Sequence, residues 1–284
     1  MQEHMALYKY VEPVRIDVLR SGKIRFTPPH SLNDPFELNP YFMGLMDRAR
    51  LLSELDSKYS TIVNATIRAY PAAVRAEVER QVLAMLVTEG EQLRHEFEAM
   101  SAVEAKESGA RILAWVNRKL GMLALSEVPD DILMWSHYAD GHKGMVLEFD
   151  DSHSWFNGMH PANPLFTRSL KVQYGRERPA LVLDKFDQVT IFLAKSDRWK
   201  YEREVRVIRP LEEADEVRDG ENIHLFQIPP ACITAVVCGC RADGAVLAEV
   251  RELARTDPRW RHLKIRRAWL NEVAYLLHIR DDDV

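Results

Sequence analysis

The chain has few cysteines, and they are placed where they exclude two common roles. Its 284 residues contain three, Cys232, Cys238 and Cys240. An odd number so close together does not build a disulfide framework, and the separation of Cys238 and Cys240 is not that of a zinc finger. We therefore expect Cys232 and Cys238 to pack as small apolar side chains in a buried strand.

Long apolar runs and a strong charge of one sign are also missing. No segment approaches the roughly 20 apolar residues that span a bilayer, and residues 1–5 are polar, unlike the apolar centre of a signal peptide. A net charge of −5 gives no general attraction to nucleic acid or to an anionic membrane. The composition, 46% hydrophobic and 29% charged, is that of a globular protein. Together these features predict a cytoplasmic protein with no membrane partner.

Signatures of several well-known sites are absent as well. There is no glycine-rich phosphate loop, no Gly-x-Ser-x-Gly elbow and no dinucleotide fingerprint. No stripe of basic and aromatic residues suggests an RNA-binding sheet. Any site must therefore come from a less common arrangement of side chains.

What is present divides into a helical block and a strand-rich remainder. Residues 43–120 have apolar side chains at three- and four-residue spacing, for example Val74, Val78 and Val82, which predicts several amphipathic helices. This block is expected to be an insertion or cap within a single domain of residues 1–284, and it offers a surface for a partner protein. Elsewhere we expect helices at 12–21, 187–198 and 244–254.

The expected strands come in runs rather than in regular alternation with helices. They cover residues 6–10, 23–26, 120–126, 145–149, 170–174, 204–208, 223–228, 233–238, 264–270 and 273–279. This order predicts an α+β fold whose core is a mixed, mostly antiparallel sheet.

Two acidic residues mark the most informative segment, Lys-Ser-Asp-Arg-Trp-Lys-Tyr-Glu-Arg-Glu-Val-Arg-Val-Ile at 195–208. If the segment ends as a strand, Glu202, Glu204 and Arg206 share one face. Carboxylates about 6–7 Å apart at Cα repel unless a cation, a metal or a proton offsets their charge. Two interpretations stay open: a solvated strand face with Arg203 and Arg206 as counter-charges, or a functional pair in a cleft.

A second dense segment precedes the strand at 145–149. It gathers aromatic and basic side chains, namely Trp135, His137, Tyr138, His142 and Lys143. Loops that lead into strands often carry binding residues. Tyr138 or Trp135 would stack on a flat group, and His137 or His142 would hydrogen-bond or titrate near neutral pH. Alternatively, the aromatic rings belong to the core and the histidines are their polar partners.

The spacing of the two histidines does not favour a metal site. His137 and His142 match no zinc signature, so no metal is expected. A metal-dependent nuclease using Glu202, Glu204 and Asp34 remains an alternative.

Two segments near the start complete the set of candidate binding residues. Tyr8 and Tyr10 lie on one face of the first expected strand and Lys9 on the other. Asn33 and Asp34 occupy a proline-rich turn, where they either bind a ligand or hydrogen-bond their own backbone.

Taken in order, these motifs resemble a known bacterial family. The motifs are Leu-Tyr-Lys-Tyr at 7–10, Ser-Leu-Asn-Asp-Pro-Phe-Glu at 31–37, Met-Trp-Ser-His-Tyr-Ala-Asp-Gly-His-Lys-Gly at 134–144 and Trp-x-Tyr-Glu-x-Glu-x-Arg at 199–206. They are similar to the bacterial domain-of-unknown-function family 2971 over about residues 5–240. Members of this family are similar to proteins whose genes lie near phage-defence and mobile-element loci. The resemblance therefore implies an immunity or toxin role.

The chain more distantly resembles the ADP-ribosyltransferase fold, in its opening strand and its late Glu-x-Glu strand. That resemblance implies NAD as co-substrate and a protein or nucleic-acid acceptor. Glu204 would stabilise the positive charge on the ribose, with Glu202 as its partner toward the acceptor. Lys9 or Tyr8 would replace the usual first-strand Arg or His, and Tyr138 or Trp135 would stack on nicotinamide. A non-catalytic sensor that binds a nucleotide or a phage component in the same cleft is the alternative.

Overall fold

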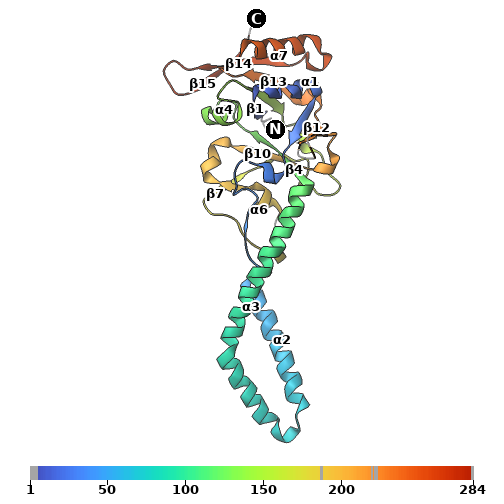
Figure 1. The fold of residues 1–284 in the computed structure, drawn as a ribbon, viewed down its shortest axis with the longest axis vertical. Coiled ribbons are helices and arrows are strands. Elements are labelled where there is room, and N and C mark those ends of the chain that lie inside the picture. The colour runs from blue at the N-terminus through green and yellow to red at the C-terminus, as the bar shows by residue number, and fades with distance from the viewer. Residues whose placement is uncertain (1–5, 186–187, 219, 221–222, 283–284) are drawn as a thin grey trace. The chain divides into compact units, whose positions relative to one another are not determined.

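The computed structural model describes residues 6–185, 188–218, 220 and 223–282 (Figure 1). The chain divides into two compact units. One comprises Met1–Leu38, Trp115–Glu177 and Phe192–Val284, and the other comprises Asn39–Ala114 and Arg178–Ile191. The first carries most of the strands and is called the sheet unit below; the second is called the helical unit.

The sheet unit is built on an eight-stranded sheet with the strand order β15-β14-β13-β5-β1-β4-β10-β6. These strands are β1 (Ala6–Val11), β4 (Leu120–Ser126), β5 (Met145–Asp150), β6 (Leu170–Lys171), β10 (Glu204–Pro210), β13 (Ile233–Cys238), β14 (Lys264–Leu270) and β15 (Leu277–Asp281). Only the β13–β14 pair is parallel among these described neighbours. The predicted α+β class, with a mixed and mostly antiparallel sheet, is confirmed.

One face of this sheet packs on the main apolar core. Alternation along β10 turns Val205 and Val207 into this core, where they are almost fully buried. Apolar residues of α1 (Asp17–Ser21) and α7 (Gly244–Thr256) cover the same core, among them Leu19 and Val250. Cys232 and Cys238 are buried free thiols in this core, as expected. Only Cys238 lies in a strand, because Cys232 belongs to the turn Pro230–Cys232 just before β13.

The other face of the sheet is covered by α4 (Ile132–Tyr138). Asp131 caps this helix by accepting hydrogen bonds from the backbone N–H groups of Leu133 and Met134. Trp135 points from α4 into a second core beside Tyr10 of β1, their rings meeting edge to face at 5.5 Å.

The sheet is weakly joined at its centre. β1 pairs with β5 along its whole length, but it pairs with β4 only at Tyr8 and Ser126. Beyond that pair β4 instead meets the residue after β2 (Lys23–Phe26), through a bridge between Thr27 and Met122. A gap therefore opens between β1 and β4 within an otherwise continuous sheet.

Smaller elements complete the sheet unit. β2 forms a separate three-stranded sheet with β12 (Ile223–Gln227) and β11 (Glu216–Arg218). The remaining elements are α5 (Ser154–Asn157), the parallel pair β7 (Gln173–Gly175) and β9 (Ala194–Ser196), and short 3₁₀ turns, including Pro13–Ile16 and Asp197–Glu202.

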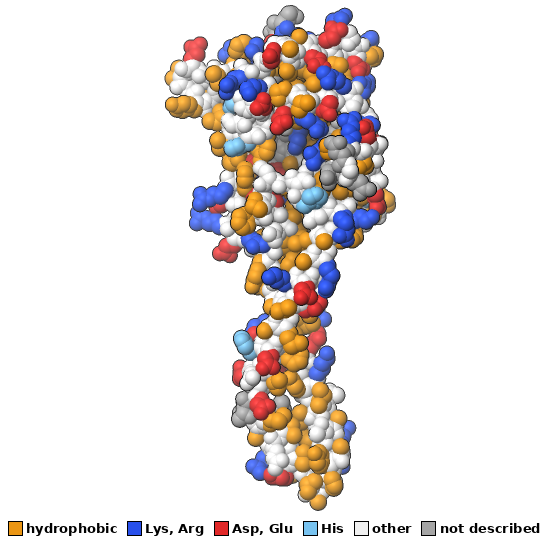
Figure 2. All heavy atoms as spheres, in the orientation of Figure 1, with side chains coloured by type: hydrophobic (Ala, Val, Ile, Leu, Met, Phe, Trp, Pro, Cys, Tyr) orange, Lys and Arg blue, Asp and Glu red, His pale blue; other side chains and the backbone are white. Residues whose placement is uncertain are grey.

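The helical unit contains α2 (Arg48–Ala69), most of α3 (Arg75–Lys119) and the parallel pair β3 (Tyr41–Gly44) and β8 (Ala180–Val182). The helices expected between 71 and 120 are one continuous helix, because neither Gly90 nor Gly109 interrupts it. Leu55 and Ala105 are buried, whereas several apolar side chains are exposed, including Ile62, Leu83, Met85 and Met100. Figure 2 shows apolar side chains at the surface of this unit. No helix in the described ranges is long and apolar enough to cross a membrane.

Three other expected elements differ from the structure. The helix expected at 187–198 is shorter, since α6 (Gln188–Leu193) gives way to β9 and a 3₁₀ turn; residue 187 lies outside the described residues. The closing hairpin has a longer connection than expected, because β15 begins only at Leu277. The strand expected at 170–174 is divided between β6 and β7.

Candidate functional site

A cavity of about 230 Å³ lies in the sheet unit beside the gap between β1 and β4. Side chains from both strands, from the turn after β2, from α4 and from the segment leading into β10 line it. They are Tyr8, Lys9, Tyr10, Thr27, Ser31, Leu32, Asn33, Glu37, Met122, Ala124, Leu125, Met134, Tyr138, Lys195, Glu202 and Glu204. All four sequence motifs thus contribute to one hollow of the molecule, the third of them through Met134 and Tyr138 of α4.

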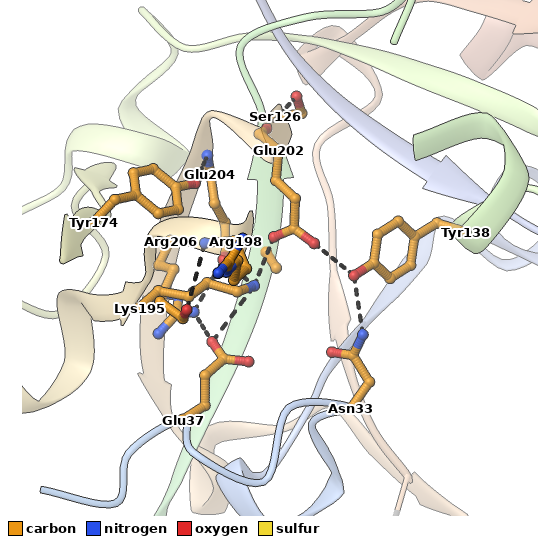
Figure 3. A network of polar contacts seen from close by, with 12 residues as sticks. Asn33, Glu37, Ser126, Tyr138, Tyr174, Lys195, Arg198, Glu202, Glu204 and Arg206 are labelled. Atoms are coloured by element: carbon orange, nitrogen blue, oxygen red, sulfur yellow. Dashed lines mark hydrogen bonds and ion pairs between the residues drawn. The ribbon is translucent and has the colours of Figure 1, made fainter. Parts of the chain in front are cut away.

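The two glutamates are held together by a buried lysine. Lys195 Nζ lies 2.6 Å from Glu202 Oε2 and 2.8 Å from Glu204 Oε2 (Figure 3). Glu202 is 3% exposed and Glu204 is 6% exposed, so they do not form a solvated face. The interpretation of the pair as an exposed strand surface was therefore wrong.

The two glutamates do not lie on one strand, although the sequence predicts this. Glu204 begins β10, but Glu202 is the last residue of the preceding 3₁₀ turn. Between them Arg203 adopts a left-handed backbone with φ of 43°, and its side chain is exposed. Arg203 is therefore not the counter-charge; the sharp change of direction lets both carboxylates reach Lys195.

Arg206 anchors the cluster from the strand side. Its guanidinium binds both oxygens of Glu204, contacts Glu37 and donates to the Phe192 carbonyl at 2.6 Å. Burial lowers the pKa of Arg206 to about 9, an effect that the charge of Asp34 opposes. Buried charges are tolerated only when paired and hydrogen-bonded, and here three carboxylates meet two buried cations.

The ionic contacts set the protonation of the cluster. Burial raises the pKa of Glu204 to about 7, although the charge of Lys195 works against this. Burial by itself would lower the pKa of Lys195, but the charges of Glu204 and Glu202 outweigh it and raise that pKa above its ordinary value. Lys195 is therefore a fixed cation, whereas Glu204 can take up a proton near neutral pH.

A chain of hydrogen bonds joins the cluster to α4 and to the turn after β2. The Tyr138 hydroxyl donates to Glu202 Oε1 at 2.6 Å and accepts from Asn33 Nδ2 at 3.0 Å (Figure 3). Burial raises the pKa of Tyr138, with a further contribution from the bond to Glu202, so the phenol stays protonated. Ser126 donates to the Glu202 carbonyl at 2.7 Å, which fixes the backbone at this point.

Tyr174 of β7 hydrogen-bonds to the backbone of Glu204. Its hydroxyl accepts a hydrogen bond from the Glu204 backbone N–H at 2.8 Å. Burial raises the pKa of Tyr174 to about 12, so this hydroxyl is also protonated at neutral pH.

The first strand brings three more of the expected residues to the cavity. Lys9 Nζ crosses to β4 and donates to the Ala124 carbonyl at 2.8 Å. Burial lowers the pKa of Lys9 to about 8, although the charge of Glu204 raises it. Tyr10 donates to the Val128 carbonyl at 2.8 Å, and Tyr8 lines the cavity from the same strand.

Other expected residues lie outside the cavity lining. Trp135 is fully buried, with Nε1 donating to the Pro129 carbonyl at 2.8 Å, so its ring is unavailable to stack on a ligand there. His142 stacks on Trp135 at 6.1 Å, as in the alternative that placed the aromatic rings in the core. His137 and Lys143 are exposed.

Asp34 is buried but belongs to its own turn. Its Oδ1 accepts from the Phe36 backbone N–H at 2.9 Å, which is the backbone role considered for it from the sequence. Its neighbour Asn33 is the one that reaches the cavity.

Lys195 and Glu37 are site residues that the sequence interpretation missed. Both lie within motifs already noted, Lys195 at the start of the 195–208 segment and Glu37 at the end of the turn motif. The pair of carboxylates at 202 and 204 requires a cation, and this requirement could have pointed to Lys195. The sequence places Lys195 in a helix, however, and Glu37 is distant in sequence from its partner Arg206.

No metal site is suggested by the cluster. Within the described part of the chain, no group of three or more His, Cys, Asp or Glu side chains is arranged to hold a metal ion. The position between Glu202 and Glu204, where a cation would bind, holds the Lys195 ammonium group.

The fold and cluster define an α+β protein in which a buried ionic network opens onto a small cavity. A sequence model of the family described as "Protein of unknown function (DUF2971)" matches residues 134–207, a segment that includes Tyr138, Lys195, Glu202 and Glu204. The match supports the resemblance to that family and does not extend to the ADP-ribosyltransferase resemblance. No curated protein and no solved structure matches the chain.

Proposed function

We propose that the cavity carries out a glycosyl transfer from NAD, of the ADP-ribosyltransferase type. The observation that carries the proposal is the placement of Glu202, a buried carboxylate on the cavity wall whose Oε1 already accepts a hydrogen bond from a hydroxyl. When bound, NAD supplies a ribose carbon that gains positive charge as nicotinamide leaves. A fixed carboxylate facing such a carbon stabilises that charge without reorganisation.

The two glutamates differ in how freely they can meet a ligand. Both oxygens of Glu204 are engaged by Arg206 and Lys195, whereas among the described residues Oε1 of Glu202 is engaged only by the Tyr138 hydroxyl. A ribose hydroxyl can replace a tyrosine hydroxyl at little cost. The proposal therefore gives Glu202 the contact with the ligand and Glu204 the anchoring role, which reverses the order that the resemblance implies.

The walls of the cavity suit one end of the dinucleotide. Tyr8 and Tyr138 present rings, and Leu32, Met122 and Met134 add apolar surface. Pockets for drug-sized ligands are usually about 300–1,000 Å³, so a cavity of about 230 Å³ holds a nicotinamide–ribose portion rather than the whole molecule.

The test measures release of nicotinamide from NAD by the full chain, with and without protein or nucleic-acid acceptors. We expect Glu202→Gln to reduce the rate by about 100-fold or more, as loss of one transition-state electrostatic contact does. Glu249→Gln is the matched control, because Glu249 of α7 pairs with Arg20 of α1 and neither lines the cavity. Circular dichroism verifies that both variants are folded. A wild-type chain that neither binds nor consumes NAD would overturn the proposal.

A second candidate function is binding without catalysis, in a sensor. The engagement of both Glu204 oxygens within the protein favours it, since such a cluster can serve to shape a cavity rather than to react. Calorimetric binding of NAD or another nucleotide, with the ligand recovered unchanged, would select this function over glycosyl transfer.

A further inference from the structure

Two lysines meet the cavity, and their surroundings are opposite. Lys195 forms ion pairs with Glu37, Glu202 and Glu204. Lys9 has no carboxylate within ion-pair distance in the described ranges, and the backbone carbonyl of Ala124 is its hydrogen-bond acceptor. A partly buried amine without a counter-ion is unusual, because a buried charge normally requires a partner.

We propose that the Lys9 amine is a covalent capture site for small hydroxylated aldehydes, which it binds as an imine. Lys9 Nζ lines the cavity and projects into the gap between β1 and β4, so a molecule in the cavity can approach it. Desolvated lysines without a fixed counter-ion are the ones that form Schiff bases with carbonyl compounds.

The reaction needs no reagent beyond the aldehyde. The Lys9 nitrogen bonds to the carbonyl carbon, the carbonyl oxygen is protonated, and the resulting carbinolamine loses water to leave a carbon–nitrogen double bond. The oxygen of the released water comes from the aldehyde, and its two hydrogens are the two that the neutral amine loses. No oxidant or reductant is involved.

The protonation states of the cavity agree with this chemistry. With its pKa lowered to about 8, roughly one Lys9 side chain in ten is neutral at pH 7, against about one in 2,500 for an ordinary lysine. Glu204 is close enough for its charge to influence Lys9, but both of its oxygens are engaged by Arg206 and Lys195, so the departing oxygen takes up the protons that the amine releases. An amine that is partly neutral at pH 7 is the form that attacks a carbonyl carbon.

The rest of the cavity selects hydroxylated compounds. Glu202 Oε1 accepts a hydroxyl hydrogen bond from Tyr138 and can accept one from a ligand in its place. A ligand whose carbonyl carbon lies at Lys9 and whose hydroxyl points toward Glu202 would bind to both side chains. An aldehyde without hydroxyl groups would bind to Lys9 alone.

The experiment traps the imine by reduction. The full chain is incubated at pH 7 with glyceraldehyde or, separately, propanal, in the presence of cyanoborohydride, and labelled lysines are located by peptide mass spectrometry. We expect glyceraldehyde to label residue 9 at least about tenfold faster than any exposed lysine, and faster than propanal does. Lys9→Met should lose this label, whereas Lys143→Met, which removes an exposed lysine, should keep it.

Three results would overturn the proposal. They are labelling spread evenly over exposed lysines, no label on residue 9 of the folded wild-type chain, and protection of Lys9 by inorganic phosphate without any adduct, which would make it an anion-binding residue. Site-resolved labelling of the wild-type chain decides the matter even if Lys9→Met fails to fold. NAD takes no part in this readout, so its outcome is independent of the glycosyl-transfer proposal.

Discussion

Arg206 holds Glu204 by both carboxylate oxygens, with Nε 2.7 Å from Oε1 and Nη2 3.0 Å from Oε2. The planar guanidinium matches a carboxylate in this two-point geometry, which lysine cannot reproduce. Because Lys195 binds the same carboxylate and also Glu202, the charges of the site form one interlocked network. Removing one member is therefore expected to affect all the others.

Lys195→Met should strongly destabilise the sheet unit. The substitution leaves the buried carboxylates of Glu37 and Glu204 with Arg206 as their remaining ion-pair partner, and that of Glu202 with the Tyr138 hydroxyl. Removing one partner from a buried ionic network costs about 3–5 kcal/mol. Urea unfolding measures the free energy, and Lys143→Met, at an exposed lysine, should change it by less than about 0.5 kcal/mol. Equal stability of the two variants would contradict the importance given to the network.

Tyr138→Phe should cost about 1–2 kcal/mol of folding free energy. The phenol donates to Glu202 and accepts from Asn33, and its loss leaves a charged oxygen without one of its donors. Thermal and urea unfolding measure the difference. Tyr275→Phe is the control, because the Tyr275 side chain is completely exposed and should lose nothing. If both variants are as stable as the wild type, the hydrogen-bond chain contributes no stability.

Lys9 should make stability depend on pH in the alkaline range. Its folded-state pKa of about 8 lies below the value of 10.5 for a free lysine, so between these values the unfolded chain binds more protons. As far as Lys9 is concerned, the free energy of unfolding is therefore highest above about pH 10.5. It falls as the pH is lowered from there to about 8, where Lys9 becomes charged in the folded protein as well.

The measurement compares wild type with Lys9→Met by urea unfolding from pH 7 to pH 10.5. The difference in unfolding free energy should shift in favour of the wild type by about 1–3 kcal/mol as the pH rises, after allowance for partial solvent screening. Titration of groups that do not interact with Lys9 cancels in the difference. A difference that stays constant over this range would show that the pKa of Lys9 is not lowered.

Gly144→Ala should destabilise the protein more than Gly141→Ala does, although both glycines lie in the same short motif. A Cβ at Gly144 would lie 2.1 Å from the Val11 carbonyl oxygen, so the backbone of β1 would have to move. A Cβ at Gly141 meets nothing within 4 Å and would suffer only from its φ of 58°. We expect about 3 kcal/mol of destabilisation at Gly144 and about 1 kcal/mol at Gly141, measured by thermal unfolding.

Local sequence patterns were sufficient to predict the bounds of several strands. The bounds of Lys23–Phe26, Leu120–Ser126 and Ile233–Cys238 agree with the sequence prediction, because each is an apolar or alternating run. Lys195–Trp199 was harder, since its residues fit a helix equally well. Pairing with β7, which comes from a separate part of the chain, places Ala194–Ser196 in a strand instead.

The sequence predicts several residues of the site but not the contacts that they make with one another. Tyr138, Glu202 and Glu204 meet as expected, but the contact of Glu37 with Arg206 joins residues far apart in sequence, which no local pattern reveals. Sequence alone also could not separate Trp135, which is core, from Tyr138, which lines the cavity. Both are aromatic residues of one short helix, and only the direction in which each side chain points distinguishes them.

The single residue pair that joins β1 to β4 gives the eight-stranded sheet a seam. On one side lie five strands from β15 to β1, and on the other lie β4, β10 and β6. Across the seam Lys9 donates to the Ala124 carbonyl and Tyr10 to the Val128 carbonyl, and Leu7 of β1 and Leu125 of β4 belong to one apolar core. Side-chain contacts, rather than a full ladder of backbone hydrogen bonds, therefore hold together the cavity wall between β1 and β4.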